Sequence, residues 1–153
     1  MTIAENSTIE FFGTQDDVTN ASNSTIAANV YSVAGDIDDW TNDDDAPEAA
    51  AVLHYTSTSA PTAGGYVALY GILKNIDSTN DESVPTATDE SAKLFGSFKI
   101  PNATSTYESI RIFLPNTVTS QVYEFYLLNK TDQTMLDTWT LKITPLTVGP
   151  HPA

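Results

Sequence analysis

The chain has 153 residues and a mass of 16.5 kDa, which suits one domain with a single hydrophobic core. Its 20 acidic residues outnumber its 6 lysines and arginines, so the formal net charge is -14, and Arg111 is the only arginine. Phosphate backbones and anionic lipids are bound by clustered cations, so we expect neither nucleic acid nor a membrane as partner. Because cysteine is absent, disulfides, thiolate catalysis and zinc–thiolate sites are excluded.

The first 27 residues are mostly small and polar, and one apolar stretch interrupts them at 8–12, before Gly13. This composition predicts an extended N-terminal arm over 1–27 that contains one short strand. Ile9, Phe11 and Phe12 are the residues that we expect to anchor this arm on a partner. The chain does not open with a basic segment and an apolar one, so a secretory signal peptide is not expected.

From residue 28 onward, short runs of β-branched and aromatic residues are separated by proline, glycine and asparagine turn signals. The runs predict strands at 29–34, 51–56, 66–76, 94–100, 109–114, 122–128 and 136–143. The apolar run at 66–76 is nearly continuous, which indicates a central strand buried on both faces. Elsewhere a period of two places Leu94, Phe98 and Trp139 among the inward-facing side chains. The sole helical possibility is one turn over 45–52, and it is not favoured.

These signals together predict an all-β fold, with an antiparallel β-sandwich over 28–144. A jelly-roll-like sandwich is the first choice for its topology and an immunoglobulin-like sandwich is the second. Pro145 is followed by two further prolines, which cannot donate ladder hydrogen bonds. Residues 145–153 are therefore expected to form an extended C-terminal tail.

Seven of the 20 acids lie within thirteen positions, between residues 36 and 48. Such a loop could offer oxygen ligands to calcium, but its spacing lacks the glycine and the final glutamate of an EF-hand loop. A solvated acidic loop is favoured over a metal site, and contact with a basic patch on a partner is a third reading. The weak metal candidates are Asp36, Asp38, Asp39, Asp43, Asp44 and Asp45. Trp40 lies in this loop outside any strand pattern, so it is predicted to contact a partner.

No catalytic constellation is evident in the chain. His54 lies in a predicted strand without a second histidine nearby, and His151 lies between two prolines. A nucleophile elbow and a phosphate-binding glycine loop are both missing from the sequence. Five N-x-[ST] triplets occur, as expected by chance in a chain so rich in Asn, Ser and Thr. We therefore expect a protein that is not an enzyme and that has no cofactor.

The C-terminal part of the chain resembles small structural proteins of tailed bacteriophages over residues 66–152. The resembling segments are 66–70 (YVALY), 73–77 (LKNID), 95–98 (FGSF), 114–116 (LPN), 123–126 (YEFY) and 148–152 (VGPHP). This resemblance implies a virion component, with a capsid decoration or cement protein as the first expectation and a neck or tail protein as another. It implies the major capsid protein and further copies of the chain as partners, a homotrimer being natural, and it carries over no functional residues.

The expected location is accordingly the outer surface of the capsid, after synthesis in the host cytoplasm. The rival from another class is a host-attachment component with a carbohydrate-binding β-sandwich, which requires an exposed aromatic platform. The aromatic candidates for such a platform are Tyr31, Trp40, Tyr55, Tyr66, Tyr70, Tyr107, Tyr126 and Trp139. Adaptation to high salt is a further explanation of the acidity, and it requires no partner.

Overall fold

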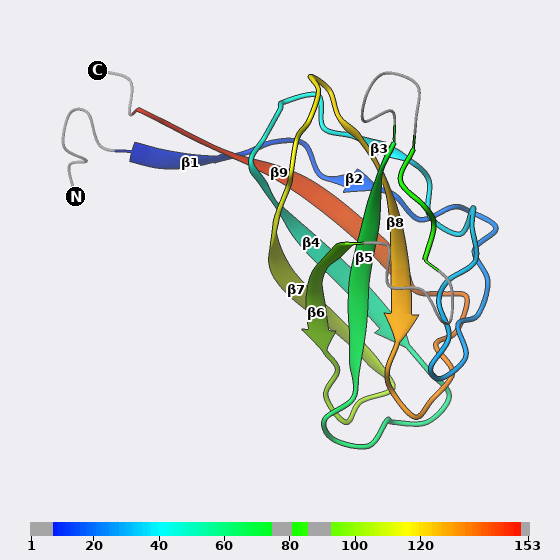
Figure 1. Ribbon diagram of the computed structural model, residues 1–153. Helices are drawn as coiled ribbons and strands as arrows, with labels where there is room; N and C mark the ends of the chain where they lie inside the picture. Colours follow the sequence, from blue (N-terminus) through cyan, green and yellow to red (C-terminus); the bar gives the residue numbers. More distant parts are fainter. Residues whose placement is uncertain (1–7, 75–80, 86–92, 151–153) are drawn as a thin grey trace, which may run out of the picture.

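The computed structural model describes residues 8–74, 81–85 and 93–150, and the side chains of residues 8, 9 and 150 lie outside the description. The described ranges contain strands and no helix, and therefore no helix that could cross a membrane. The strands form two antiparallel sheets that face each other (Figure 1). The predicted all-β fold is thus confirmed as a β-sandwich.

The sheets are built from nine described strands. Their bounds are β1 (Thr8–Phe12), β2 (Asp16–Asp17), β3 (Trp40–Thr41), β4 (Glu48–Thr56), β5 (Tyr66–Lys74), β6 (Lys93–Lys99), β7 (Ser105–Phe113), β8 (Val122–Asn129) and β9 (Thr140–Pro150). One sheet has the order β1-β9-β4-β7, with β2 also paired to β9, and the other has the order β3-β8-β5-β6.

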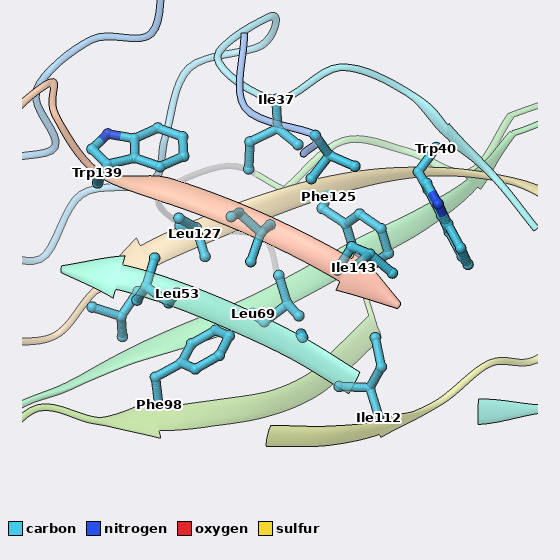
Figure 2. Packing of buried hydrophobic residues seen from close by; sticks show 14 of the residues in the cluster. Ile37, Trp40, Leu53, Leu69, Phe98, Ile112, Phe125, Leu127, Trp139 and Ile143 are labelled. Carbon is cyan, nitrogen blue, oxygen red and sulfur yellow. The ribbon is translucent and has the colours of Figure 1, made fainter. Parts of the chain in front are cut away.

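The hydrophobic core lies between the two sheets. In β4 every second residue is buried, because successive side chains in a strand point to opposite faces. Leu53 from β4, Leu69 from β5 and Phe125 from β8 meet in this space, and Figure 2 shows Trp40 and Trp139 at its two ends. The predicted inward positions of Phe98 and Trp139 are confirmed, since each side chain is at most 1% exposed.

The central strand β5 is buried on both faces, as predicted, at least up to Lys74, where the description stops. Its second face is partly covered by the side chain of Tyr31, which comes from a segment whose backbone pairs with the edge of β8. Tyr31 forms a bridge with Leu128, and its ring packs edge-on against Tyr70 at 5.4 Å between centroids. Ile72 and Tyr126 form a small second cluster beneath these rings. The segment 29–34, predicted as a strand, is not a continuous strand, but it pairs with the end of β8 through this bridge and through backbone hydrogen bonds of Asn29, Val30 and Ser32.

The inward orientation predicted for Leu94 is wrong, because Leu94 is 58% exposed. The cause is an irregularity in the pairing of β5 with β6, where Leu69 faces Gly96 while the next residue, Tyr70, faces Leu94. The extra residue, Phe95, turns into the sandwich and packs against the core. A β-bulge of this kind inverts the alternation on one side of the insertion, which a simple period of two cannot anticipate.

Two further expectations differ from the structure. Residues 145–150, predicted as a tail, continue strand β9, in which Pro145 faces Ala49 of β4. Its carbonyl oxygen accepts a hydrogen bond from the backbone amide of Gly13 at 2.9 Å. No helical turn forms over 45–52, where β4 begins at Glu48.

Candidate functional site: the projecting ribbon

The first and last described strands form a two-stranded ribbon at one corner of the sandwich. Residues 8–12 of β1 pair with residues 146–150 of β9, from Thr8 opposite Pro150 to Phe12 opposite Leu146. On the other side of β9, pairing with β4 ends where Glu48 faces Leu146. Residues 147–150 therefore have no described strand on that side, and β1 has none on its outer side. Figure 1 shows the ribbon extending beyond the rest of the sandwich.

The ribbon carries apolar side chains on both of its faces. Phe11 is 43% exposed and Phe12 is 67% exposed, and the two rings point to opposite faces because they are neighbours in one strand. Val148, which is 53% exposed, lies on the same face as Phe12. Phe11 lies over Gly149, where a Cβ atom would come within 3.2 Å of its ring. Over the described residues, Phe11 on one face and Phe12 and Val148 on the other thus present exposed apolar surface to a partner.

The predicted anchor residues are thus brought together in one element. Phe11 and Phe12 lie in β1 with exposed side chains, and Ile9 faces Gly149 in the same ladder, although its side chain is not described. Their role in binding a partner remains a prediction.

Arg111 ties the ribbon to the far edge of its sheet. It lies in β7, yet its Nη1 atom is 2.5 Å from Oε1 of Glu10 in β1, and its Nε atom pairs with Glu48 in β4. The hydrogen bonds to Glu48 and then to Glu10 raise the pKa of Arg111. Leu146 on this outer sheet face is only 3% exposed. The charge of Glu10, the only charged residue of β1, is balanced by this pairing.

The edge of the sheet becomes acidic beyond the ribbon. Strand β2 pairs with β9 on the same side as β1 and presents Asp16 and Asp17, both exposed. Asp16, Asp43 and Asp44 line a polar cavity of about 220 Å³ against Trp40. The nearest described cation to this group is Lys142, at 4.0 Å from Asp17. The edge strand β1 is therefore followed along the same edge by acidic groups with little compensation.

Trp40 itself belongs to the core rather than to an exposed loop. It begins β3, which pairs with β8, and its ring lies 5.8 Å from that of Tyr123 and 6.3 Å from that of Phe125. Its side chain is 4% exposed, and its Nε1 atom donates to Asp16 at 2.9 Å. A strand of two residues leaves no periodic signal in the sequence, which is why this burial was not expected. Of the residues predicted to contact a partner, Phe11 and Phe12 are therefore exposed and Trp40 is not.

The remaining acids of the loop are mostly engaged by separate groups. Asp36 is 3% exposed and accepts hydrogen bonds from Ser24 and from the amide of Val33. Asp38 accepts from Asn20 at 2.8 Å, and Asp45 accepts from the amide of Ser120 at 2.7 Å. Over the described residues, no three carboxylate or histidine side chains are grouped as metal ligands would be. These contacts fasten the loop to its surroundings.

Lys74 fastens the same loop to the other sheet. Its Nζ atom lies 3.2 Å from Glu124, 3.6 Å from Asp39 and 3.7 Å from Asp81. Burial lowers the pKa of Lys74, but the hydrogen bond to Glu124 and the three negative charges outweigh it, so the pKa is raised. Lys74 therefore stays charged and neutralises part of the acidic loop.

A second exposed feature lies on the outer face of the first sheet. His54 of β4 and Tyr107 of β7 are opposite each other, and their rings stack with centroids 4.2 Å apart and an interplanar angle of 7°. The Nε2 atom of His54 lies 3.1 Å from Oγ of Ser105. Tyr107 is 70% exposed, so one face of its ring is open to solvent. His151, the other histidine, lies outside the described residues.

No protein-family model matches this chain, and no curated protein sequence matches it.

Proposed function

We propose that the protein is a non-enzymatic structural component of a virion, most specifically a capsid decoration or cement protein bound to the outer capsid lattice. The observation that carries the proposal is the β1–β9 ribbon, which projects from a well-packed sandwich with apolar side chains on both faces. An isolated two-stranded ribbon is marginally stable in water, so contact with a partner is what would stabilise it. A rigid module with a docking arm is the construction that a lattice-binding protein requires.

The strand pairing supports a jelly-roll topology for the module. Apart from β2, the antiparallel pairs are nested, since β1 pairs with β9, β3 with β8, β4 with β7 and β5 with β6. This is the arrangement of one long hairpin rolled into two four-stranded sheets. Jelly rolls are used in viral capsid proteins and also in lectins, so the topology is compatible with the proposal without deciding it.

The charge distribution supports an outer position on the capsid. A net charge of -14 would be repelled by packaged nucleic acid, and it keeps an exposed surface soluble. The buried polar groups also serve the fold: Asn42 and Asn129 are fully buried, and each holds backbone groups of neighbouring loops through its amide. In this proposal the major capsid protein is the partner, and repeated copies of the chain occupy equivalent lattice positions.

The proposal is tested by asking whether the chain is a stoichiometric part of a particle. Virus particles from a culture that carries the gene are banded on a density gradient, and this chain and the major capsid protein are quantified by mass spectrometry. We expect the chain to band with intact particles in a fixed ratio to the capsid protein. If the chain stays at the top of the gradient, or bands at a level unrelated to the capsid protein, the proposal is wrong.

The second candidate is a carbohydrate-binding host-attachment protein, and the stacked pair of His54 and Tyr107 favours it. An aromatic ring open on one face can stack on a sugar ring, and the hydroxyl of Ser105 lies beside it. This candidate predicts that the purified chain binds saccharides on a glycan array and that Tyr107→Ala abolishes the binding. Loss of binding in Tyr107→Ala together with absence from the capsid band would favour attachment over decoration.

A further inference from the structure

We infer that the partner of this protein adds a basic β-strand to the free edge of β1, so that the first sheet continues into the partner. The inference deepens the proposed function, on which it rests, by stating the chemistry of the surface that receives the ribbon. It is carried by three features of the described residues: an open strand edge, apolar side chains on both faces of that strand, and acids with little compensating positive charge along the same edge.

The first feature is the open edge itself. A strand at the edge of a sheet presents unpaired amide and carbonyl groups, and proteins usually protect such edges with lysine, proline, a bulge or a covering segment. Strand β1 contains neither lysine nor proline, and its register with β9 has no shift. No described segment covers it. Its residues, Thr-Ile-Glu-Phe-Phe, also have high β-propensity apart from the glutamate. The free edge of β1 is therefore suited to the addition of a further strand.

The second feature specifies what the added strand must contain beside its backbone. Phe11 and Phe12 project to opposite faces of β1, and both are exposed. A strand placed next to β1 presents its own side chains alternately to these two faces. Apolar residues on such a strand would bury the two phenylalanine rings, which supplies the non-polar part of the contact.

The third feature specifies the charge of the partner. A strand that extends along β1 toward β2 meets Asp16 and Asp17, and Asp43 and Asp44 lie beside Asp16 at the cavity. Only Lys142 is near these groups among the described residues, at 4.0 Å from Asp17, whereas Glu10 is already paired with Arg111. Lysine or arginine side chains on the incoming strand would complete this charge balance.

The same charges argue against a second copy of the chain as the added strand. Two copies each carry a net charge of -14, which opposes their association. Antiparallel pairing of two β1 strands about their centre would also place Glu10 directly opposite Glu10 of the other copy, and like charges in that position are destabilising. The occupant is therefore a different protein with a basic extended segment.

The test uses a short synthetic peptide of alternating lysine and valine as the probe, added to the isotope-labelled full chain. A matched peptide with the same side chains and an N-methyl group on every backbone amide retains the charge but cannot donate ladder hydrogen bonds from either edge. We expect shifts in the amide resonances of residues 8–12 and 16–17, and binding at least about tenfold tighter than that of the methylated peptide, because several backbone hydrogen bonds are lost. A peptide of alternating glutamate and valine should not bind.

Equal binding of the two basic peptides would overturn the inference, because attraction between charges alone would then explain it. Shifts centred away from β1, binding of the glutamate peptide, or no binding at all would overturn it as well. The double variant Phe11→Ser/Phe12→Ser should bind the lysine–valine peptide more weakly, and Leu94→Ser, which alters an exposed apolar residue in the other sheet, should bind it normally. Since no virus particle is involved, this result is independent of the gradient experiment, and either proposal can fail alone.

Discussion

Arg111 of β7 is paired with Glu10 of β1, with Nη1 and Oε1 2.5 Å apart, although β9 and β4 lie between the two strands in the sheet. The only arginine of the chain thus joins the two edges of one sheet and reaches Glu48 of β4 on the way. Among the described strands β1 pairs with β9 alone, so the ion pair with Arg111 adds a second restraint at the base of the ribbon. The position of the ribbon is therefore set by one long-range ion pair as well as by the ladder.

Replacing the arginine should loosen the ribbon while leaving the sandwich intact. In Arg111→Gln we expect faster amide hydrogen exchange in residues 9–12, with unchanged exchange in β5 and β8, because exposed ion pairs contribute little to global stability. Lys142→Gln is the matched control, since it removes an exposed cation from the same sheet whose only described pair is at 4.0 Å. Equal exchange of β1 in the wild type and in Arg111→Gln would show that the pair does not restrain the ribbon.

The bulge in β6 predicts opposite consequences for two neighbouring residues. Leu94→Ser should change the free energy of unfolding by no more than about 0.5 kcal/mol, because Leu94 is mostly exposed. Phe95→Ala should cost about 3 kcal/mol, because the Phe95 ring packs against Tyr123 and Phe125. Urea unfolding of the two variants measures both values. A larger loss for Leu94→Ser than for Phe95→Ala would contradict the bulged register of β6.

Burial of Trp40 predicts a large cost for its removal. Trp40→Ala should lower the free energy of unfolding by about 3 to 5 kcal/mol, since the indole ring fills one end of the core. Tyr107→Ala removes a ring that is 70% exposed and serves as the control, with an expected loss well below that of Trp40→Ala. Urea unfolding followed by circular dichroism compares the two variants. Similar losses would mean that Trp40 is not a core residue.

Two buried phenols predict a loss of stability in alkali. Burial raises the pKa of Tyr123, and burial together with the hydrogen bond to Glu124 raises that of Tyr126. Because the pKa is higher in the folded state, the two neutral phenols stabilise the fold fully below the unfolded pKa of about 10. This stabilisation is lost as the pH rises above that value. The urea concentration at the unfolding midpoint should therefore be lower at about pH 11 than at about pH 8. The decrease should be smaller in Tyr123→Phe/Tyr126→Phe. An identical fall in this double variant would assign the effect to other groups.

The sequence could predict the sandwich because most of its strands follow local rules. Alternation identified the inward positions of Phe98 and Trp139, and the continuous apolar run at 66–76 identified the strand that is covered on both sides. Phe11 and Phe12 were predicted as anchors because they are the large apolar residues of a polar segment, and they do lie together on an exposed strand.

Local sequence patterns could not predict the features that depend on contacts between residues far apart in the chain. The inverted register at Leu94 depends on how β6 meets β5, and the burial of Trp40 depends on the pairing of a two-residue strand with β8. The pair of Arg111 and Glu10 joins positions about a hundred residues apart, and the stack of His54 with Tyr107 requires the register of β4 and β7. The continuation of β9 through Pro145 likewise depends on partners on both of its sides.

The central claim is that the β1–β9 ribbon docks the protein on the outside of a capsid, and rebinding to particles tests it most directly. Particles that lack the chain are mixed with purified wild type, with Phe11→Ser/Phe12→Ser or with Tyr107→Ser, and bound copies are counted after sedimentation. Unfolding curves of the three proteins first establish that each is folded. We predict that wild type and Tyr107→Ser saturate the particles, while the ribbon variant binds at least about tenfold more weakly, as loss of aromatic anchors implies. Undiminished binding of the ribbon variant would contradict docking through the ribbon.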